Sequence, residues 1–113
     1  MLTIYHNPRC SKSRQTLTLL QENTQQEIKI VEYLKEPISQ SEIESLLSLL
    51  TCKPIDMMRT KESEFKEQNL KGADDQTLIA AMVATPKLIE RPIVSDGVKA
   101  VIGRPPENVL AIC

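Results

Sequence analysis

The sequence predicts a single α/β domain with a mixed four-stranded sheet, and three observations lead to this prediction. A strand–helix–strand pattern opens the chain, a hairpin pattern lies near its end, and a run of helical patterns separates the two. The length of 113 residues fits one domain, because domains most often hold about 100–150 residues. We therefore expect one domain over 1–113, with a helical insertion at about 39–85.

The N-terminal part of the chain is predicted to form a strand, a helix and a second strand. Residues 2–6 are apolar and partly β-branched, and Asn7-Pro8 after them is a turn signal. The spacing of apolar residues is helical from Ser11 to about Glu22, and apolar and charged side chains alternate over 27–33. Two such strands joined by a helix predict a parallel pair with a right-handed crossover.

The middle of the chain has helical patterns only. Ser39 and Glu42 match a capping box, and a helical apolar stripe follows them at Ile43, Leu46, Leu47 and Leu50. The polar stretch 60–71 is expected to form helical turns that Gly72 closes. Asp74 or Asp75 is expected to cap one more helix, which Pro86 ends and whose apolar residues are Leu78, Ile79, Met82 and Val83.

The C-terminal part is predicted to form a hairpin and a short helix. Residues 92–95 and 98–102 are strand-like, and Asp96-Gly97 between them is a hairpin turn signal. Pro105 and Pro106 favour the start of a terminal helix, whose apolar residues are Val109, Leu110 and Ile112. The whole order, β-α-β, helices, then β-β-α, is that of a thioredoxin-like fold with a helical insertion.

The overall charge and the cysteine pattern exclude several function classes. A formal net charge of −1 argues against nucleic acid or a membrane surface as a bulk electrostatic partner. The sequence shows no signal-peptide pattern, and no apolar run reaches the roughly 18 residues needed to cross a bilayer. Three scattered cysteines do not form a disulfide framework or a metal site. We expect a cytoplasmic protein with no bound metal and no bound cofactor.

The segment around Cys10 is the strongest candidate for chemistry. Cys10 lies in a short loop after a predicted strand and directly before a predicted helix. Unpaired N–H groups and the positive end of the helix dipole favour a thiolate there, and Arg9, Lys12 and Arg14 are close in sequence. Such surroundings lower the pKa of a cysteine, and the thiolate is the attacking species. We therefore predict that Cys10 is a reactive cysteine.

The neighbours of Cys10 limit the chemistry. A free cysteine is often a small buried hydrophobic residue, but a loop of Asn, Pro, Arg and Ser is a poor place to bury one. Ser13 makes the motif Cys-x-x-Ser, so Cys10 lacks the partner thiol of a dithiol oxidoreductase and an external thiol is the natural resolving group. His6 has two possible roles. It could act at the site, by polarising the thiol or contacting an anion, or it could be a structural residue. Cys52 and Cys113 are expected to be passive.

The segment Tyr5-His6-Asn7-Pro8-Arg9-Cys10-Ser11-Lys12-Ser13-Arg14 closely resembles the signature of the glutaredoxin-linked arsenate reductases. The resemblance continues in order along the chain, through Met58-Arg59-Thr60-Lys61, Asp74-Asp75-Gln76, Ile89-Glu90-Arg91-Pro92-Ile93-Val94 and Gly103-Arg104-Pro105-Pro106. The chain is shorter at its C-terminus than the long members of that family and resembles a short-form member. The resemblance implies a thioredoxin-like fold with a helical insertion.

The resemblance also implies a mechanism. Cys10 would attack arsenate to form a thiol–arsenate adduct, glutathione would attack next as co-substrate, and glutaredoxin would complete the reduction to arsenite. The oxyanion-binding arginines of the family correspond to Arg59, Arg91 and Arg104, and guanidinium groups suit a multiply charged tetrahedral oxyanion. The simpler interpretation of each arginine is a surface ion pair, most readily for Arg59, which adjoins a Lys/Glu-rich segment.

Four further residues are expected to support the site: His6, Asn7, Ser13 and Pro92. Pro92 corresponds to the loop proline that is cis in thioredoxin-like folds. Two other functions stay open at this point. The chain more distantly resembles the Spx-type regulators that bind RNA polymerase, although Ser13 breaks their Cys-x-x-Cys switch. It could also be a monothiol glutaredoxin-like thiol transferase, for which the arginines would matter little.

Overall fold

A four-stranded sheet in the order β2-β1-β3-β4 organises the first part of the structure, a computed structural model that describes residues 1–113. β1 (Leu2–Tyr5) pairs in parallel with β2 (Ile28–Val31). On its other side β1 pairs antiparallel with β3 (Ile93–Ser95), which pairs antiparallel with β4 (Ala100–Ile102). The predicted α/β fold with a mixed four-stranded sheet, thioredoxin-like with a helical insertion, is confirmed.

The chain divides into two compact units. The sheet belongs to the first unit, which consists of Met1–Glu36 and Arg91–Cys113, and the helical segment Pro37–Glu90 is the second unit. The single domain over 1–113 stays a prediction. No helix in the chain is both long enough and apolar enough to span a membrane.

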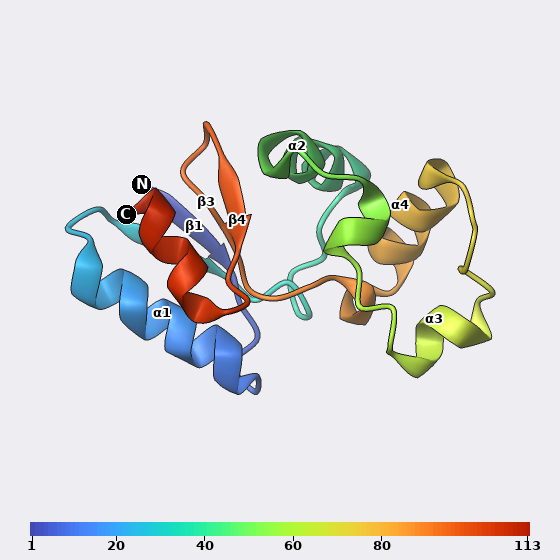
Figure 1. The fold of residues 1–113 in the computed structure, drawn as a ribbon, viewed down its shortest axis with the longest axis horizontal. Coiled ribbons are helices and arrows are strands. Elements are labelled where there is room, and N and C mark those ends of the chain that lie inside the picture. The colour runs from blue at the N-terminus through green and yellow to red at the C-terminus, as the bar shows by residue number, and fades with distance from the viewer. The chain divides into compact units, whose positions relative to one another are not determined.

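Two helices cover one face of the sheet in the first unit, α1 (Ser11–Asn23) and the C-terminal 3₁₀ helix η3 (Pro106–Ile112), which lie side by side (Figure 1). Strand alternation explains why they pack there. Leu2 and Ile4 point to one face, and the register places Ile28 beside Leu2 and Val94 beside Ile4 on that same face. The resulting core is closed by residues of both helices: Leu20, Val109 and Ile112.

The second unit has three α-helices and two short 3₁₀ helices. α2 (Gln40–Leu50) is followed by η1 (Pro54–Met57), α3 (Ser63–Glu67), α4 (Asp75–Ala84) and η2 (Pro86–Leu88). Both predicted caps are present: Ser39 Oγ accepts from the N–H of Glu42 at 3.2 Å, and Asp74 Oδ1 accepts from the N–H of Thr77 at 2.8 Å. α4 packs against α2, η1 and η2, and the buried apolar residues include Ile43, Leu46, Met57, Leu78, Ile79 and Met82.

The structure corrects two predicted boundaries and the type of one predicted helix. The second strand is Ile28–Val31 and not 27–33, because Glu32 starts a turn in which its carbonyl accepts from the N–H groups of Lys35 and Glu36. The last strand starts at Ala100 and not at Val98, because Asp96 Oδ1 accepts from the N–H groups of both Val98 and Lys99 at 2.8 Å. The hairpin loop is therefore four residues long.

The third correction concerns the terminal helix. It is a 3₁₀ helix, in which every third side chain lies on the same side. Pro106, Val109 and Ile112 have that spacing and are buried, whereas Leu110, the third apolar residue named for this helix, is 45% exposed.

Candidate active site

Cys10 lies between β1 and α1, where the chain leaves the sheet and starts the helix. It is the N-cap residue of α1, and its own N–H donates to the carbonyl of Asn7 at 3.0 Å. Asn7 also fixes the next residue, since its Oδ1 accepts from the N–H of Arg9 at 3.0 Å. Asn7 is itself buried, whereas Cys10 is partly exposed. The loop thus presents the thiol to solvent at the first turn of the helix.

The surroundings of Cys10 stabilise its thiolate. Burial by itself would raise the pKa of the thiol, but hydrogen bonds from the N–H groups of Ser13 and Lys12 and from the side chain of Arg91 outweigh it. The positive charge of Arg91 acts in the same direction, and the net result is a pKa below the ordinary value of 9.0. Free N–H groups of a first helical turn and a nearby guanidinium are the groups that lower a cysteine pKa.

His6 and Ser13 form a buried pair behind the Cys10 loop. The Nδ1 atom of His6 lies 2.6 Å from Oγ of Ser13, and the same Oγ accepts from the N–H of Asn7 at 3.0 Å. Burial lowers the pKa of His6 below 6.5, which Arg14 reinforces and Glu32 opposes. A neutral imidazole can accept a hydrogen bond from the Ser13 hydroxyl at Nδ1. This arrangement makes His6 a support of the loop backbone through Ser13.

Arg91 and Pro92 bring the second loop to the cysteine. The Arg91–Pro92 peptide bond is cis, as the family resemblance implies, and the side chain of Arg91 reaches Cys10. The Nε atom of Arg91 is buried and has no hydrogen-bond partner. An unpaired donor beside a nucleophile is a place where a substrate oxygen can bind, because buried donors without partners are costly.

Gly103 lets the chain pass close to this loop. Its N–H donates to the carbonyl of Pro92 at 2.8 Å. A Cβ at this position would lie 2.8 Å from Thr16 Oγ1 and 2.9 Å from Pro92 Cγ, so only glycine fits without movement of a neighbour. Gly103 therefore allows the chain just before Arg104 to lie close to both Pro92 and α1.

Arg104 belongs to the same unit as Cys10 and precedes a second cis proline bond, to Pro105. Its side chain is exposed. Asn108 holds its backbone, since Nδ2 of Asn108 donates to the carbonyls of Ile102 at 3.2 Å and of Arg104 at 3.1 Å. The structure thus anchors the backbone of Arg104, and its role as an oxyanion ligand stays a prediction.

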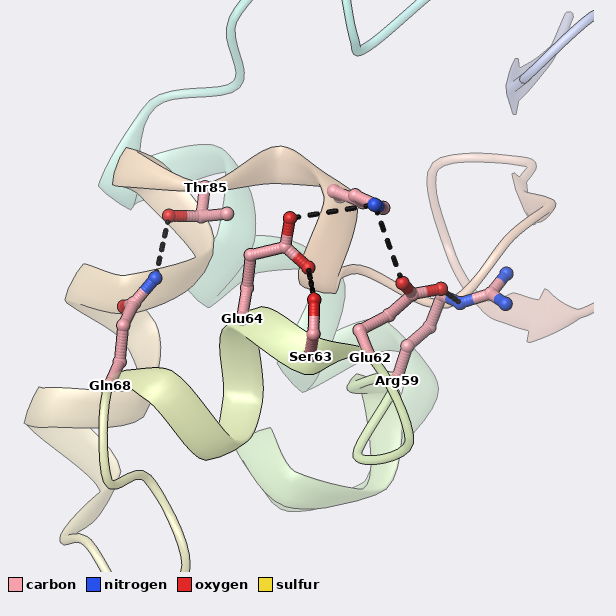
Figure 2. A network of polar contacts seen from close by, with 7 residues as sticks. Arg59, Glu62, Ser63, Glu64, Gln68 and Thr85 are labelled. Carbon is pink, nitrogen blue, oxygen red and sulfur yellow. Dashed lines mark hydrogen bonds and ion pairs between the residues drawn. The ribbon is translucent and has the colours of Figure 1, made fainter.

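Arg59 lies in the second unit, so its role in a site with Cys10 also stays a prediction. Within that unit its Nε forms an ion pair with Glu62 Oε1 at 3.0 Å, the kind of pairing that the Lys/Glu-rich segment makes easy. Its Nη1 atom is buried and has no hydrogen-bond partner. The ion pair with Glu62, drawn in Figure 2, therefore satisfies Nε of Arg59 but not Nη1.

The other two cysteines differ from Cys10. All three are free thiols, and burial raises the pKa of both Cys52 and Cys113, with Asp56 adding to the effect at Cys52. Cys113 ends η3, beside Ile112, which packs with Leu20 near the far end of α1. No group of three or more His, Cys, Asp or Glu side chains is placed to hold a metal ion.

Some contributors were expected from the sequence and others were missed. The N–H groups of Lys12 and Ser13 contact Cys10, and these are the unpaired N–H groups that the sequence predicts at the start of the helix. Thr16 lies beside Gly103, and its hydroxyl donates to the carbonyl of Lys12 at 2.8 Å. Glu62 holds Arg59, and the spacing of three residues between them was the available signal.

The comparisons with known proteins agree along almost the whole chain. Residues 5–112 match the ArsC family. The uncharacterized protein YfgD of Escherichia coli is 51% identical over 112 residues, covering 96% of this chain and 93% of that protein. A Haemophilus influenzae protein named arsenate reductase is 47% identical over 112 residues, covering 96% of each. The solved structure of an arsenate reductase from Vibrio cholerae has a TM-score of 0.92 at 47% identity, covering 99% of this chain and 97% of that one.

Proposed function

The chain belongs to the ArsC family, and from this premise we propose that it reduces arsenate to arsenite with Cys10 as its single nucleophile. The observation that carries the proposal is the relationship between Arg91 and Cys10. Arg91 stabilises the thiolate and keeps a buried Nε without a partner. A site for an anionic oxygen beside an anionic sulfur needs such a cation, because the two charges otherwise repel each other.

In the proposed first step the Cys10 thiolate attacks arsenic(V). A sulfur–arsenic bond forms and one arsenate oxygen leaves as water after taking up protons. Arg91 and Arg104 bind the remaining oxygens and disperse the negative charge that the two anions bring together. Arsenic is still in its oxidised state after this step, so two electrons have yet to be supplied.

In the proposed second step glutathione supplies the other thiol. Its sulfur attacks the Cys10 sulfur, a disulfide forms, and the electron pair of the breaking sulfur–arsenic bond stays on arsenic, which leaves as arsenite. The two thiols together have then lost two electrons. Glutaredoxin removes the glutathione by thiol–disulfide exchange and regenerates the Cys10 thiolate. The partners of this proposal are therefore arsenate, glutathione and glutaredoxin.

A surface pocket that includes Ser11, the residue after Cys10, supports the entry of an external thiol. It has a volume of about 500 Å³ and is lined by the first turns of α1 and by the start of η3: Ser11, Arg14, Gln15, Thr18, Leu19, Pro106 and Glu107. The volume is in the range of small-molecule sites. Cys113 lies at the other end of η3, away from the residues that line this pocket.

Arsenite release by the purified protein tests this function. With arsenate, glutathione and glutaredoxin, the protein should turn over repeatedly, and Cys10→Ser should abolish release. The matched control is the double variant Cys52→Ser/Cys113→Ser, which should retain turnover. Absence of arsenite from the unmodified protein would refute the proposal. Turnover that depends on Cys52 or Cys113 would refute the single-nucleophile step.

A second assay separates this function from simple thiol transfer. Arg104→Ala should lower arsenite release strongly, yet leave the reaction of Cys10 with a neutral mixed disulfide nearly unchanged. Equal losses in both reactions would mean that the arginine supports the thiol and not the oxyanion. Arg91→Ala is compared only at a pH where Cys10 is fully ionised, because Arg91 also lowers the pKa of the thiol.

A further inference from the structure

The pocket that includes Ser11, called the Ser11 pocket below, has opposite charges on its two walls. Arg14 lines it from α1, and Glu107 lines it from η3, which lies beside α1 (Figure 1). All of its lining residues belong to the first unit, which also contains Cys10. A ligand that carries both a negative and a positive group would therefore find a partner for each of them in this pocket.

Both charged side chains of the Ser11 pocket keep groups that can bind a ligand. Arg14 donates from Nη1 to the carbonyl of Pro8 at 2.9 Å, and a guanidinium has five N–H donors in all. Glu107 is exposed and takes part in none of the ion pairs of the chain. One donor thus holds Arg14 against the Cys10 loop while the others can bind a carboxylate, and the carboxylate of Glu107 can bind an ammonium group.

The length and volume of the Ser11 pocket suit a tripeptide. Its lining residues on α1 run from Ser11 to Leu19, which corresponds to a rise of roughly 12 Å along the helix. A tripeptide in extended form spans about 10 Å, and the volume of about 500 Å³ is in the range of small-molecule sites. Leu19 and Pro106 add apolar contacts. The pocket therefore starts at the residue that follows Cys10 and is long enough for a small peptide.

A second pocket on the same loop suits such a ligand less well. It has a volume of about 220 Å³, and its charged lining residues include Arg9, Glu32 and Lys35. Glu32 Oε1 lies 3.7 Å from Nζ of Lys35, so these two charges already pair with each other. The Ser11 pocket, in which Arg14 and Glu107 form no such pair, is the better site for a ligand with charges of both signs.

We propose that the Ser11 pocket binds the thiol co-substrate as a zwitterionic peptide, with a carboxylate of the peptide on Arg14 and its ammonium group on Glu107. Glutathione has this chemistry, and the inference rests on the proposed function for the identity of the ligand. In the exchange step the glutathione thiolate forms a bond to the Cys10 sulfur. The bond between Cys10 and its leaving group breaks, and the electron pair departs with that group. Arg14 and Glu107 bind the peptide and take no part in the bond change.

The experiment follows one exchange step that needs no arsenate. In the double variant Cys52→Ser/Cys113→Ser, which leaves Cys10 as its single thiol, Cys10 is converted to a mixed disulfide with thionitrobenzoate, a coloured leaving group. The rate of colour release is measured against the concentration of glutathione and, separately, of mercaptoethanol, which has no charged group. The rate with glutathione should saturate, because a complex forms before the exchange. The rate with mercaptoethanol should rise in proportion to its concentration.

Arg14→Ala in this background tests the carboxylate contact. The ratio of the glutathione rate constant to the mercaptoethanol rate constant should fall about tenfold, the size of one hydrogen bond to a charged group. The ratio removes any effect on Cys10 itself, because a change in the loop at Pro8 alters both reactions alike. Lys35→Ala is the matched control, since it removes a positive charge at the smaller pocket, and it should leave the ratio nearly unchanged. Equal losses with the two thiols would overturn the role of Arg14.

Glu107→Gln separates ammonium binding from general electrostatics. Glutathione has two carboxylates and one ammonium group, so the loss of a nearby negative charge speeds its reaction if charge alone decides. Ammonium binding by Glu107 predicts the opposite: the reaction of glutathione should slow several-fold. The reaction of N-acetylglutathione, which lacks the ammonium group, should not slow. A faster reaction of glutathione with Glu107→Gln would overturn the role of Glu107.

Failure of this site and failure of the proposed function have different readouts. Arsenite release by the unmodified protein measures the function, whereas thionitrobenzoate release requires only Cys10 and a thiol. Arsenite release without saturation by glutathione, and with ratios that neither Arg14→Ala nor Glu107→Gln lowers, would refute the site and keep the function. Saturation that depends on both side chains, without arsenite release, would support the site and refute the function.

Discussion

His6 and Ser13 share a buried hydrogen bond of 2.6 Å between Nδ1 and Oγ, seven residues apart in the chain. The same Ser13 oxygen accepts from the N–H of Asn7 at 3.0 Å, and the N–H of Ser13 stabilises the Cys10 thiolate. One serine therefore links the end of β1 to the first turn of α1. Ser13, the last residue of the Cys-x-x-Ser motif, thus supports the loop at the place where a dithiol enzyme has its second cysteine.

Ser13→Ala should destabilise the protein. The substitution removes the acceptor of the Asn7 N–H and the partner of His6, and a buried polar group left unpaired costs about 1–3 kcal/mol. Urea unfolding measures the free energy of unfolding. Ser11→Ala, at an exposed position two residues away, is the matched control and should change it far less. Equal effects of the two substitutions would contradict the structural role of Ser13.

The burial of His6 predicts a pH dependence of stability. Its pKa lies below 6.5 in the folded protein because of burial. Below pH 6.5 the unfolded chain therefore binds a proton that the folded chain does not, so the free energy of unfolding falls as the pH drops. The slope from this one group is at most about 1.4 kcal/mol per pH unit.

Urea unfolding between pH 5 and 8 checks this dependence against His6→Asn, which lacks the titrating group. The difference in unfolding free energy between the two proteins should shift in favour of the variant as the pH falls. A difference that stays constant across this range would show that His6 has an ordinary pKa in the folded protein.

Cys10 should be alkylated at lower pH than the other cysteines. Its pKa is lowered by N–H donors and by Arg91, whereas burial raises the pKa values of Cys52 and Cys113. Since only the thiolate reacts, the rate at Cys10 should reach half its maximum at a lower pH. Iodoacetamide labelling followed by peptide mass spectrometry measures all three cysteines in one sample.

Arg91→Ala sharpens the labelling experiment. The Cys10 midpoint should move to higher pH, because a hydrogen bond and a positive charge are lost together. Lys53→Ala, beside Cys52, is a matched removal of charge and should leave the Cys10 midpoint in place. If the Cys10 midpoint is the same in Arg91→Ala as in the unmodified protein, the contact between Arg91 and Cys10 is contradicted.

Gly103→Ala should be destabilising by about 1–3 kcal/mol, the usual cost of an extra methyl group in a packed site. The new Cβ would lie 2.8 Å from Thr16 Oγ1 and 2.9 Å from Pro92 Cγ. Adding Thr16→Ala should return part of the lost free energy of unfolding, since it removes one of the two obstacles. No recovery in the double variant would show that the clash with Pro92 dominates.

The sequence predicted the elements that have a strong local signal. Ser39 was placed correctly as a cap, and of the two candidates Asp74 and Asp75 the structure selects Asp74. The Asp96-Gly97 turn was predicted, but its length was not, because Asp96 caps two N–H groups and extends the loop. The exposure of Leu110 could not be predicted, because apolar character alone does not distinguish an α-helix from a 3₁₀ helix, and the two have different periods.

The sequence predicted which residues belong to the candidate site better than it predicted which of them touch each other. Cys10 could be found because a cysteine before a helix is a recognisable pattern, and Arg91 because of the family resemblance. Its contact with Cys10 joins segments 81 residues apart, which no local pattern reveals. The bond between His6 and Ser13 places His6 against the loop backbone, and a part of His6 in the chemistry of Cys10 stays a prediction.

The most direct test of the account is a single turnover with arsenate and glutathione but without glutaredoxin. Arsenite is quantified, and the protein is digested and analysed by mass spectrometry. We predict one arsenite for each protein molecule, with an equal amount of glutathione on Cys10 as a mixed disulfide. Arsenite formed together with a disulfide between two cysteines of the chain, or no arsenite at all, would contradict it.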